Sequence, residues 1–310
     1  MINLNLSGCK GFTAHRSGWA FCINALRPFH STSGILVDDF LERSFAWDLS
    51  GYYYGANQYN LPYREKWVGF IHNPPNTPPW FDFYNSPQAI LGREVFQASL
   101  QHCACLITLS EYLKDWLQAR VDVPVISLRH PTETPHHKWS PVKFMQNKQP
   151  PVIQIGYWLR RMEAILDLQT PYPYKKMWLP SNSAYTMEVL GVYEKTRTKF
   201  WEDKYRWSGV GYSEWVSNDT YDKLLSSGII FLNLYDSSAN NAVIEAIARN
   251  TPILINRVPA VVEYLGEDYP LYYNNLEEAA HILSNRQNIF DAHEYLKNMG
   301  LQEYKDKINL

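Results

Sequence analysis

The chain has 310 residues, of which 45% are apolar and 19% charged, a globular composition with room for about two domains. A formal net charge of −2 provides no basic stripe, so we expect no nucleic-acid partner. No stretch approaches about 18 apolar residues and the start lacks a signal-peptide core, so we expect a soluble, cytoplasmic protein. Peripheral contact with a membrane stays open.

The first half alternates apolar runs of strand length with helical patterns. Strands are expected over residues 2–6, 35–40, 66–72, 104–109 and 123–129, and helices over 18–29, 86–102 and 111–120. Ser110 is the expected N-cap of the last of these helices. This alternation predicts a parallel sheet covered by helices on both faces.

The second half repeats the pattern after a polar, proline-rich segment. Strands are expected over 151–156, 228–235, 251–256 and 269–273, and helices over 158–168, 185–202, 219–225, 240–248, 258–265 and 276–283. We therefore predict an α/β protein with two Rossmann-like, doubly wound domains. Their expected bounds are 1–135 and 151–290, with a linker at 136–150 and a terminal helix at 291–310 that packs back on the first domain.

Ligands of open parallel sheets bind beyond the carboxyl ends of the strands, at helix N-termini. After the strand at 228–235, Asn240 and Asn241 open a helix whose free N–H groups are suited to a diphosphate. Glu245, one turn inside, is placed to accept two ribose hydroxyls, and Asp236 and Ser237 are expected to contact a sugar. In the alternative interpretation, Asp236 and Ser237 cap the helix and Glu245 is solvated.

His72 ends an apolar run immediately before a loop with four prolines in six positions. This placement favours a role as a base or as a partner of an acceptor hydroxyl, although single histidines are more often structural. Asn73 and Trp80 are the expected wall of an acceptor site. The histidines beside the linker and the four cysteines lack the spacing of metal ligands, so no metal site and no metal cofactor are expected.

The segment that begins at Ser237 and runs through Glu245 to Asn250, Thr251 and Pro252 resembles the donor-site signature of retaining GT-B glycosyltransferases of the "glycosyl transferases group 1" type. Glu245 matches the second glutamate of that signature, which in the family binds the ribose of the nucleotide sugar. Ser237 replaces the first glutamate, with Asp236 beside it. Asn250 replaces a glycine and tolerates the same left-handed conformation.

Weaker similarities extend over most of the chain. The strand at 152–156 resembles the first strand of the family's second domain, which is followed by an arginine and a lysine that clamp the diphosphate. Tyr157 and Met162 occupy those two positions here, so Arg160 and Arg161 are expected to supply the charge. Tyr212 falls in the segment 209–216, where the family has its nucleotide-base loop, and Gly18 ends a loop that resembles the one approaching the donor phosphate.

The resemblance implies two domains facing across a cleft and transfer of a sugar from a nucleotide-sugar donor to a glycan or glycolipid acceptor. Transfer would be metal-independent, with retention at the anomeric carbon and no cofactor besides the nucleotide-sugar co-substrate. The implied catalytic residues are His72, Arg161 and Asp236. The implied donor-binding residues are Gly18, Tyr157, Arg160, Arg161, Tyr212, Ser237, Asn240, Asn241 and Glu245, and the acceptor-side residues are Asn73 and Trp80.

Two other functions stay open. A nucleotide-sugar epimerase on the same scaffold would need buried carboxylates near both faces of the sugar, and the first half shows no such acidic cluster in the sequence. A catalytically silent nucleotide-sugar binding protein is compatible with the absent first glutamate and the shifted basic pair, because the fold alone does not specify activity.

Overall fold

The computed structural model describes residues 3–9, 18–47, 61–130, 132, 135–171, 173–180, 184–196, 209–213 and 215–308. By their internal contacts, the residues form two compact units. The first comprises Met1–Glu133 together with Asp236–Asn241, and the second comprises Thr134–Tyr235 together with Ala242–Leu310.

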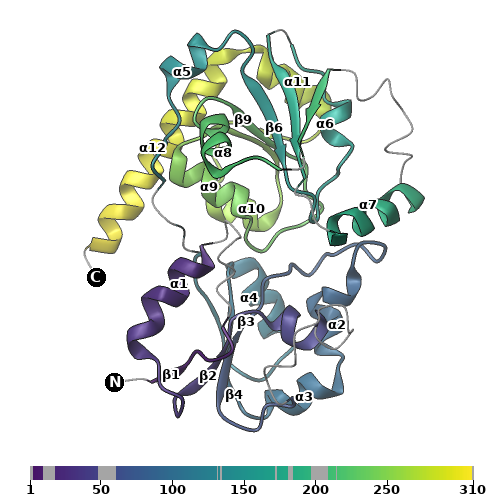
Figure 1. Ribbon diagram of the computed structural model, residues 1–310, viewed down its shortest axis with the longest axis vertical. Helices are drawn as coiled ribbons and strands as arrows, with labels where there is room; N and C mark the ends of the chain where they lie inside the picture. The colour runs from purple at the N-terminus through teal and green to yellow at the C-terminus, as the bar shows by residue number, and fades with distance from the viewer. Residues whose placement is uncertain are drawn as a thin grey trace. The chain divides into compact units, whose positions relative to one another are not determined.

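The first unit contains a parallel sheet in which the spatial order of the strands follows the chain, β1-β2-β3-β4-β5. Figure 1 shows helix α1 on one side of these strands and helices α2 and α3 on the other. The strands are β1 (Leu4–Asn5), β2 (Ile35–Asp38), β3 (Trp67–Phe70), β4 (Cys103–Thr108) and β5 (Val125–Ser127), and the α-helices are α1 (Trp19–Leu26), α2 (Pro87–Leu91), α3 (Glu94–Leu100) and α4 (Glu111–Gln118). Short 3-10 and π-helical segments are η1 (Arg27–Phe29), η2 (Arg43–Trp47) and η3 (Phe83–Asn85).

The core of the first unit is formed by large apolar side chains from the sheet and its helices. Trp67 of β3 packs beside Phe45 and Tyr63, and Phe96 of α3 meets the Phe45 ring edge-on at 5.0 Å between centroids. Leu113 and Leu117, on the apolar face of α4, are fully buried in the same cluster. Aromatic side chains bury the largest areas, and they account here for part of the aromatic content of the sequence.

The second unit contains a six-stranded parallel sheet with the order β11-β10-β9-β6-β7-β8. Its strands are β6 (Pro151–Ile155), β7 (Lys175–Leu179), β8 (Val210–Tyr212), β9 (Ile229–Leu232), β10 (Ile253–Asn256) and β11 (Tyr272–Tyr273). The chain builds the sheet outward from β6 in one direction through β7 and β8, and then returns to continue from β9 in the other direction. The direction reverses between β6 and β9, which is the topological switch point of a doubly wound sheet.

Helices cover this second sheet on both sides. In Figure 1, α9 and α12 lie on one side of β6 and β9 and α6 lies on the other. The helices are α5 (Pro141–Gln146), α6 (Ala164–Asp167), α7 (Ala184–Thr196), α8 (Asn218–Leu225), α9 (Asn241–Arg249), α10 (Pro259–Leu265), α11 (Leu276–Ser284) and α12 (Arg286–Ile308). The prediction of two Rossmann-like, parallel-sheet α/β domains is confirmed.

Several local predictions are also confirmed. Ser110 is the N-cap of α4, where its side-chain oxygen accepts a hydrogen bond from the Leu113 N–H. Strand β3 ends two residues before His72, and α9 begins at Asn241. Asn250 adopts the left-handed conformation with φ of 57°, in the place where the resembled family has glycine.

Other local predictions are wrong. The helix expected over 158–168 is a series of turns followed by the four-residue α6, because the chain after β6 bridges to Leu234 at Arg160. The helix expected over 86–102 is broken into α2 and α3 at Gly92. Strand β7 was not predicted, and the loop expected at 209–216 contributes edge strand β8. The last part of the helix expected over 185–202 lies outside the described residues.

Replacing Asn250 tests the conformational requirement after α9. We expect Asn250→Val to lower the free energy of unfolding by about 1–2 kcal/mol, because a β-branched side chain is strained at positive φ. Asn250→Gly is the matched control and should leave stability nearly unchanged, since the backbone oxygen that contacts His293 is retained. Denaturant unfolding followed by circular dichroism measures both. Equal losses in the two variants would show that the side chain matters and not the backbone conformation.

Candidate functional site

The switch point of the second sheet brings together two loops that follow adjacent parallel strands. Residues 156–161 follow β6, and the chain from Asn233 follows β9. The loops are joined by backbone hydrogen bonds from the Arg161 N–H to the Asn233 oxygen at 2.8 Å and from the Tyr235 N–H to the Leu159 oxygen at 2.9 Å. These bonds fix both arginines of the first loop beside the start of the second, where ligands of doubly wound sheets bind.

Arg160 is a buried cation at this position, with 9% of its surface exposed. Its Nη1 donates to the Trp158 oxygen at 2.7 Å, and its guanidinium group packs against Gly156, where φ is +72° and a Cβ atom would lie 3.3 Å from Cζ. Burial lowers the pKa of Arg160 to about 10, while Tyr221 and Tyr157 act in the opposite direction. The group therefore stays charged at neutral pH in a place where water screens little, which favours binding of an anion.

Glu245 lies on α9, four residues after the helix begins, and is 7% exposed. Its Oε2 accepts a hydrogen bond from the Tyr221 hydroxyl at 2.6 Å, and its Oε1 lies 3.7 Å from Nη2 of Arg249. Arg249 also pairs with Asp222 at 3.0 Å. Tyr221 thus contacts the carboxylate directly. The Glu245 carboxylate is therefore held by a tyrosine and lies near an arginine of its own helix.

Arg161 and Tyr212 each have an aromatic neighbour. The Arg161 guanidinium carbon lies 5.2 Å from the centroid of the Tyr235 ring, within the range of a cation–π contact. Tyr212 ends edge strand β8, and its ring lies 5.5 Å from that of Trp178. Tyr157, in the turn after Gly156, is half-buried.

The segment Asp236–Asn241, which links β9 to α9, has its contacts with the first unit. Asp236 Oδ2 accepts hydrogen bonds from the Asn76 N–H at 2.9 Å and from the Tyr112 hydroxyl at 3.0 Å, and its Oδ1 accepts from the Ser237 N–H at 2.8 Å. Burial raises the pKa of Asp236, and these hydrogen bonds oppose the rise. Asp236 is therefore a buried, fixed carboxyl group. Ser237 is buried, and Asn240 and Asn241 are half-buried where α9 begins.

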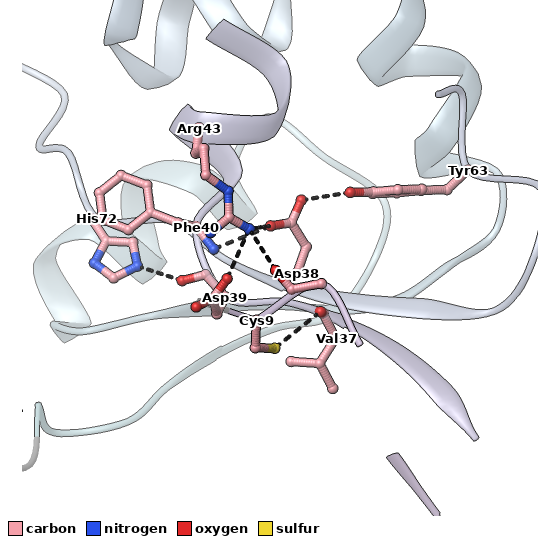
Figure 2. Close-up of polar contacts among 9 residues, drawn as sticks. Cys9, Val37, Asp38, Asp39, Phe40, Arg43, Tyr63 and His72 are labelled. Atoms are coloured by element: carbon pink, nitrogen blue, oxygen red, sulfur yellow. Dashed lines mark hydrogen bonds and ion pairs between the residues drawn. The ribbon is translucent and has the colours of Figure 1, made fainter. Parts of the chain in front are cut away.

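The imidazole of His72 contacts two aromatic rings. Phe40 stacks on the imidazole at 4.1 Å between centroids, and Trp19 meets it edge-on at 5.0 Å. Nε2 lies 3.0 Å from the backbone oxygen of Asp39 (Figure 2). Because a carbonyl oxygen only accepts, Nε2 carries the proton and Nδ1 keeps its lone pair. Burial lowers the pKa of His72 to about 3, so the ring is neutral at physiological pH.

The other residues predicted for the first unit have structural contacts. Asn73 is buried, and its Nδ2 donates to the Asn85 oxygen at 2.8 Å. Trp80 is half-buried with its ring 5.5 Å from that of Phe81. Gly18 is the N-cap of α1, with φ of 75°. The loop before Gly18 lies outside the described residues from Lys10 to Ser17.

The first unit contains an acidic cluster that the sequence analysis did not find. Asp38, at the end of β2, and Asp39 and Glu42, which follow it, are all buried. Arg43 Nη2 lies 2.9 Å from Asp39 Oδ1 and 3.8 Å from Asp38 Oδ1, and the Tyr63 hydroxyl donates to Asp38 Oδ2 at 2.8 Å (Figure 2). The expectation that no such cluster exists was wrong. The two aspartates are engaged by an arginine and a tyrosine.

Glu42 differs from its two neighbours because its partners are backbone groups. Its Oε1 accepts hydrogen bonds from the N–H groups of His72 and Asn73, each at 2.7 Å. Burial raises the pKa of Glu42 to about 7, and repulsion from Asp38 adds to the rise while the two hydrogen bonds oppose it. Glu42 therefore changes its charge near neutral pH.

The described residues contain no group of three or more His, Cys, Asp or Glu side chains arranged to hold a metal ion. The four cysteines are free thiols, and burial raises the pKa of each, to about 11 for Cys22 and about 12 for Cys103. None is activated as a nucleophile. Among the described helices, none combines the length and the apolar character that crossing a membrane requires.

Comparison with known proteins gives relatives by structure only. No family model and no curated sequence matches the chain. Solved structures of similar fold include Anabaena HepE in complex with UDP and glucose, with a TM-score of 0.58 and 11% identity over 77% of this chain and 68% of that one. Sucrose-phosphate synthase from Thermosynechococcus elongatus gives a TM-score of 0.59 and 12% identity over 93% of this chain and 76% of that one. An α,α-trehalose-phosphate synthase from Burkholderia vietnamiensis gives a TM-score of 0.54 and 11% identity over 93% of this chain and 71% of that one.

The residues of these groups that were not identified from the sequence include Tyr221, Arg249, Glu42 and Arg43. Arg249 follows Glu245 by four positions on one helix, a spacing that predicts contact and was available as a signal. Tyr221 contacts a residue 24 positions away and Glu42 contacts residues about 30 positions away, so no local pattern reports them.

Replacing Arg43 tests how strongly buried Asp38 and Asp39 destabilise the fold when their cation is missing. We expect Arg43→Met to lower the free energy of unfolding by about 3–5 kcal/mol, because Asp38 and Asp39 would stay buried without their cation. Lys114→Met, which breaks an exposed pair with Glu111 in the same unit, is the control and should change stability by less than about 1 kcal/mol. Urea unfolding measures both. Similar small losses would show that the cluster is neutralised in another way.

Proposed function

We propose that this chain is a glycosyltransferase of the GT-B type, similar to the group 1 enzymes, and that it transfers a sugar from a nucleotide-sugar donor. The observation that carries the proposal is the placement of buried Arg160 in the loop after β6 and of buried Glu245 on the helix after β9, the two strands between which the order of the second sheet reverses. A buried cation for a diphosphate and a buried carboxylate for a ribose are the two groups that a nucleotide sugar requires. HepE, which shares the fold, binds UDP and glucose.

The second unit holds the nucleotide in this proposal. Glu245 accepts the ribose hydroxyls, and Tyr221 gives up or shares its hydrogen bond when they arrive. Arg160, Arg161 and the N-terminus of α9 at Asn240 and Asn241 stabilise the negative charge that the leaving nucleoside diphosphate gains. This stabilisation operates without a divalent ion. Tyr157 and Tyr212 provide aromatic surface for the nucleotide, and Gly18 allows close approach of the backbone to phosphate.

The first unit contributes the acceptor side and the sugar contacts. A histidine whose pKa is lowered to about 3 is a weak base, so His72 acts first as a hydrogen-bond acceptor that orients the attacking hydroxyl of a glycan or glycolipid. Asn73 and Trp80 form the wall of this site. Asp236, fixed by Asn76 and Tyr112, takes the sugar contact of the absent first glutamate with Ser237 beside it. Retention at the anomeric carbon follows from the family resemblance.

The deciding experiment is a thermal-shift and donor-turnover screen of the purified protein against UDP-, GDP-, ADP- and CMP-linked sugars, with EDTA present. One nucleotide sugar that raises the unfolding midpoint and releases its sugar slowly would support a metal-independent transferase and name its donor. Binding without release, also with candidate glycans added, would assign a silent nucleotide-sugar binding protein. Conversion of the sugar to its epimer would assign an epimerase. No response to any nucleotide would contradict the proposal.

Glu245 should control affinity for the nucleotide. We expect Glu245→Ala to weaken binding by about 10- to 100-fold, because hydrogen bonds to a charged group are worth about 1.5–3 kcal/mol. Glu245→Gln keeps the side-chain volume and the contact with Tyr221 and should lose part of this affinity. Isothermal titration with the nucleotide found in the screen measures the loss. Glu277→Ala, on the exposed face of α11, is the control. Unchanged binding in folded Glu245→Ala would remove the ribose assignment.

The arginine pair should act on the transition state. We expect the double variant Arg160→Gln, Arg161→Gln to lower kcat by about 100- to 1000-fold, because the missing cations no longer stabilise the leaving diphosphate. Arg257→Gln, which breaks an exposed pair with Glu267, is the matched control and should retain activity. Steady-state kinetics and thermal unfolding are measured together. Wild-type turnover in the double variant would place the diphosphate elsewhere.

A further inference from the structure

His72 is fixed to the segment Asp39–Glu42 at three points. The Asp39 oxygen accepts from Nε2, the Phe40 ring stacks on the imidazole, and the Glu42 carboxyl group accepts from the backbone N–H of His72. Four consecutive residues therefore determine both the backbone position and the ring orientation of the histidine. Nδ1 makes no hydrogen bond to any residue in the described part of the chain.

Glu42 makes the backbone part of this arrangement. One oxygen receives two consecutive N–H groups, from His72 and Asn73, and such a pair curves the chain around an anion. The side chain is fully buried, and its other oxygen, Oε2, has no hydrogen-bond partner within the described residues. A buried carboxyl oxygen without a partner costs stability, so the position is unfavourable for folding alone.

We propose that Glu42 is a positioning residue, which fixes the His72–Asn73 backbone and thereby presents the neutral His72 ring with its Nδ1 lone pair to a substrate hydroxyl. The identity of that hydroxyl rests on the proposed function, whereas the link between Glu42 and His72 does not. Ionised Glu42 makes charge-assisted hydrogen bonds, which are shorter and stronger than those of the protonated acid. The His72–Asn73 backbone is therefore held more firmly when Glu42 has lost its proton.

Several ionisable groups lie around Glu42. Its pKa is raised to about 7 by burial and by Asp38. His72, on the strand end that Glu42 contacts, is neutral above about pH 3, and His130 lies beyond the Trp19 ring. Arg43, next in sequence, is engaged with Asp38 and Asp39. Activity that depends on ionised Glu42 should fall as the pH drops below 7.

The test compares wild-type protein with Glu42→Gln, Glu42→Ala and the exposed control Glu94→Gln, each labelled with 15N-histidine. His72 is assigned among the nine histidines by its absence in a His72→Gln variant. In the wild type we expect the His72 amide signal to titrate near pH 7 and the ring to be a single Nε2–H tautomer. Glu42→Gln keeps an oxygen for both N–H groups, so the tautomer should stay while the titration disappears. In Glu42→Ala the ring should become a mixture of tautomers and its pKa should rise.

Persistence of the amide titration in Glu42→Gln, or an unchanged tautomer and pKa in folded Glu42→Ala, would overturn the proposal. If Glu42→Ala does not fold, the Glu42→Gln titration decides alone. With the nucleotide sugar from the screen, Glu42→Ala should lower kcat by about 10- to 100-fold with little change in KM for the nucleotide sugar, since misplacement of a reacting partner slows the chemical step. Glu42→Gln should retain kcat and lose the fall below pH 7. Absence of turnover in the wild type would refute the proposed function, and the imidazole signals would still decide the role of Glu42.

Discussion

Parallel strands cannot be joined by tight turns, so each pair needs a crossover connection that carries the chain back to the end of the sheet where the strands begin. As a result, all loops that follow the strands lie at the carboxyl ends of the strands, whatever their separation along the chain. In the second unit, reversal of the strand order between β6 and β9 leaves two of these loops side by side without a covering connection. Arg160 and Glu245 lie there for this topological reason, and the hydrogen bonds between the loops make the arrangement rigid.

The first unit differs from the second because it buries a cluster of charged side chains. Its sheet has no reversal among the described strands, and its polar groups are concentrated after β2. Each of the three carboxyl groups there has a distinct partner: an arginine, a tyrosine or a pair of peptide N–H groups. Desolvation makes every one of these contacts necessary, because an unpaired carboxylate at such a position would cost several kcal/mol. The same desolvation lowers the pKa of His72, so one physical effect is the largest cause of the pKa shifts of His72, Asp38 and Glu42.

Much of the fold could be predicted from the periodicity of apolar residues and from the residue types that mark the ends of helices. Gly228–Tyr235 gave an apolar run that only a buried strand explains, and Ser110 and Asn250 marked a helix start and a helix end by residue type. Lys175–Leu179 was missed because it begins with two lysines, and only burial of Trp178 and Leu179 shows it to be a strand. The turns after β6 were mistaken for a helix because their apolar residues are buried by contacts with the chain after β9, which no local window contains.

For the candidate site, the sequence indicated positions better than interactions. Glu245 and Arg160 could be placed by their distance from strand ends, but the contact of Glu245 with Tyr221 could not, because it depends on tertiary packing. His72 was singled out by the prolines that follow it, whereas Glu42, which holds its backbone, carries no local signal. A side chain that bonds to the backbone of a distant strand cannot be recognised from a sequence pattern. Every residue except proline has a backbone N–H, so the residue types do not reveal such a contact.

The four cysteines have a practical consequence. Their thiols are sheltered enough for burial to raise every pKa, so only a very small fraction is thiolate at neutral pH. Maleimides and alkyl halides react with the thiolate, and their reaction with the native side chains is therefore slow. A cysteine introduced on an exposed face of either unit would be modified first. Fluorophores or spin labels can thus be attached at chosen sites while the natural thiols are left in place.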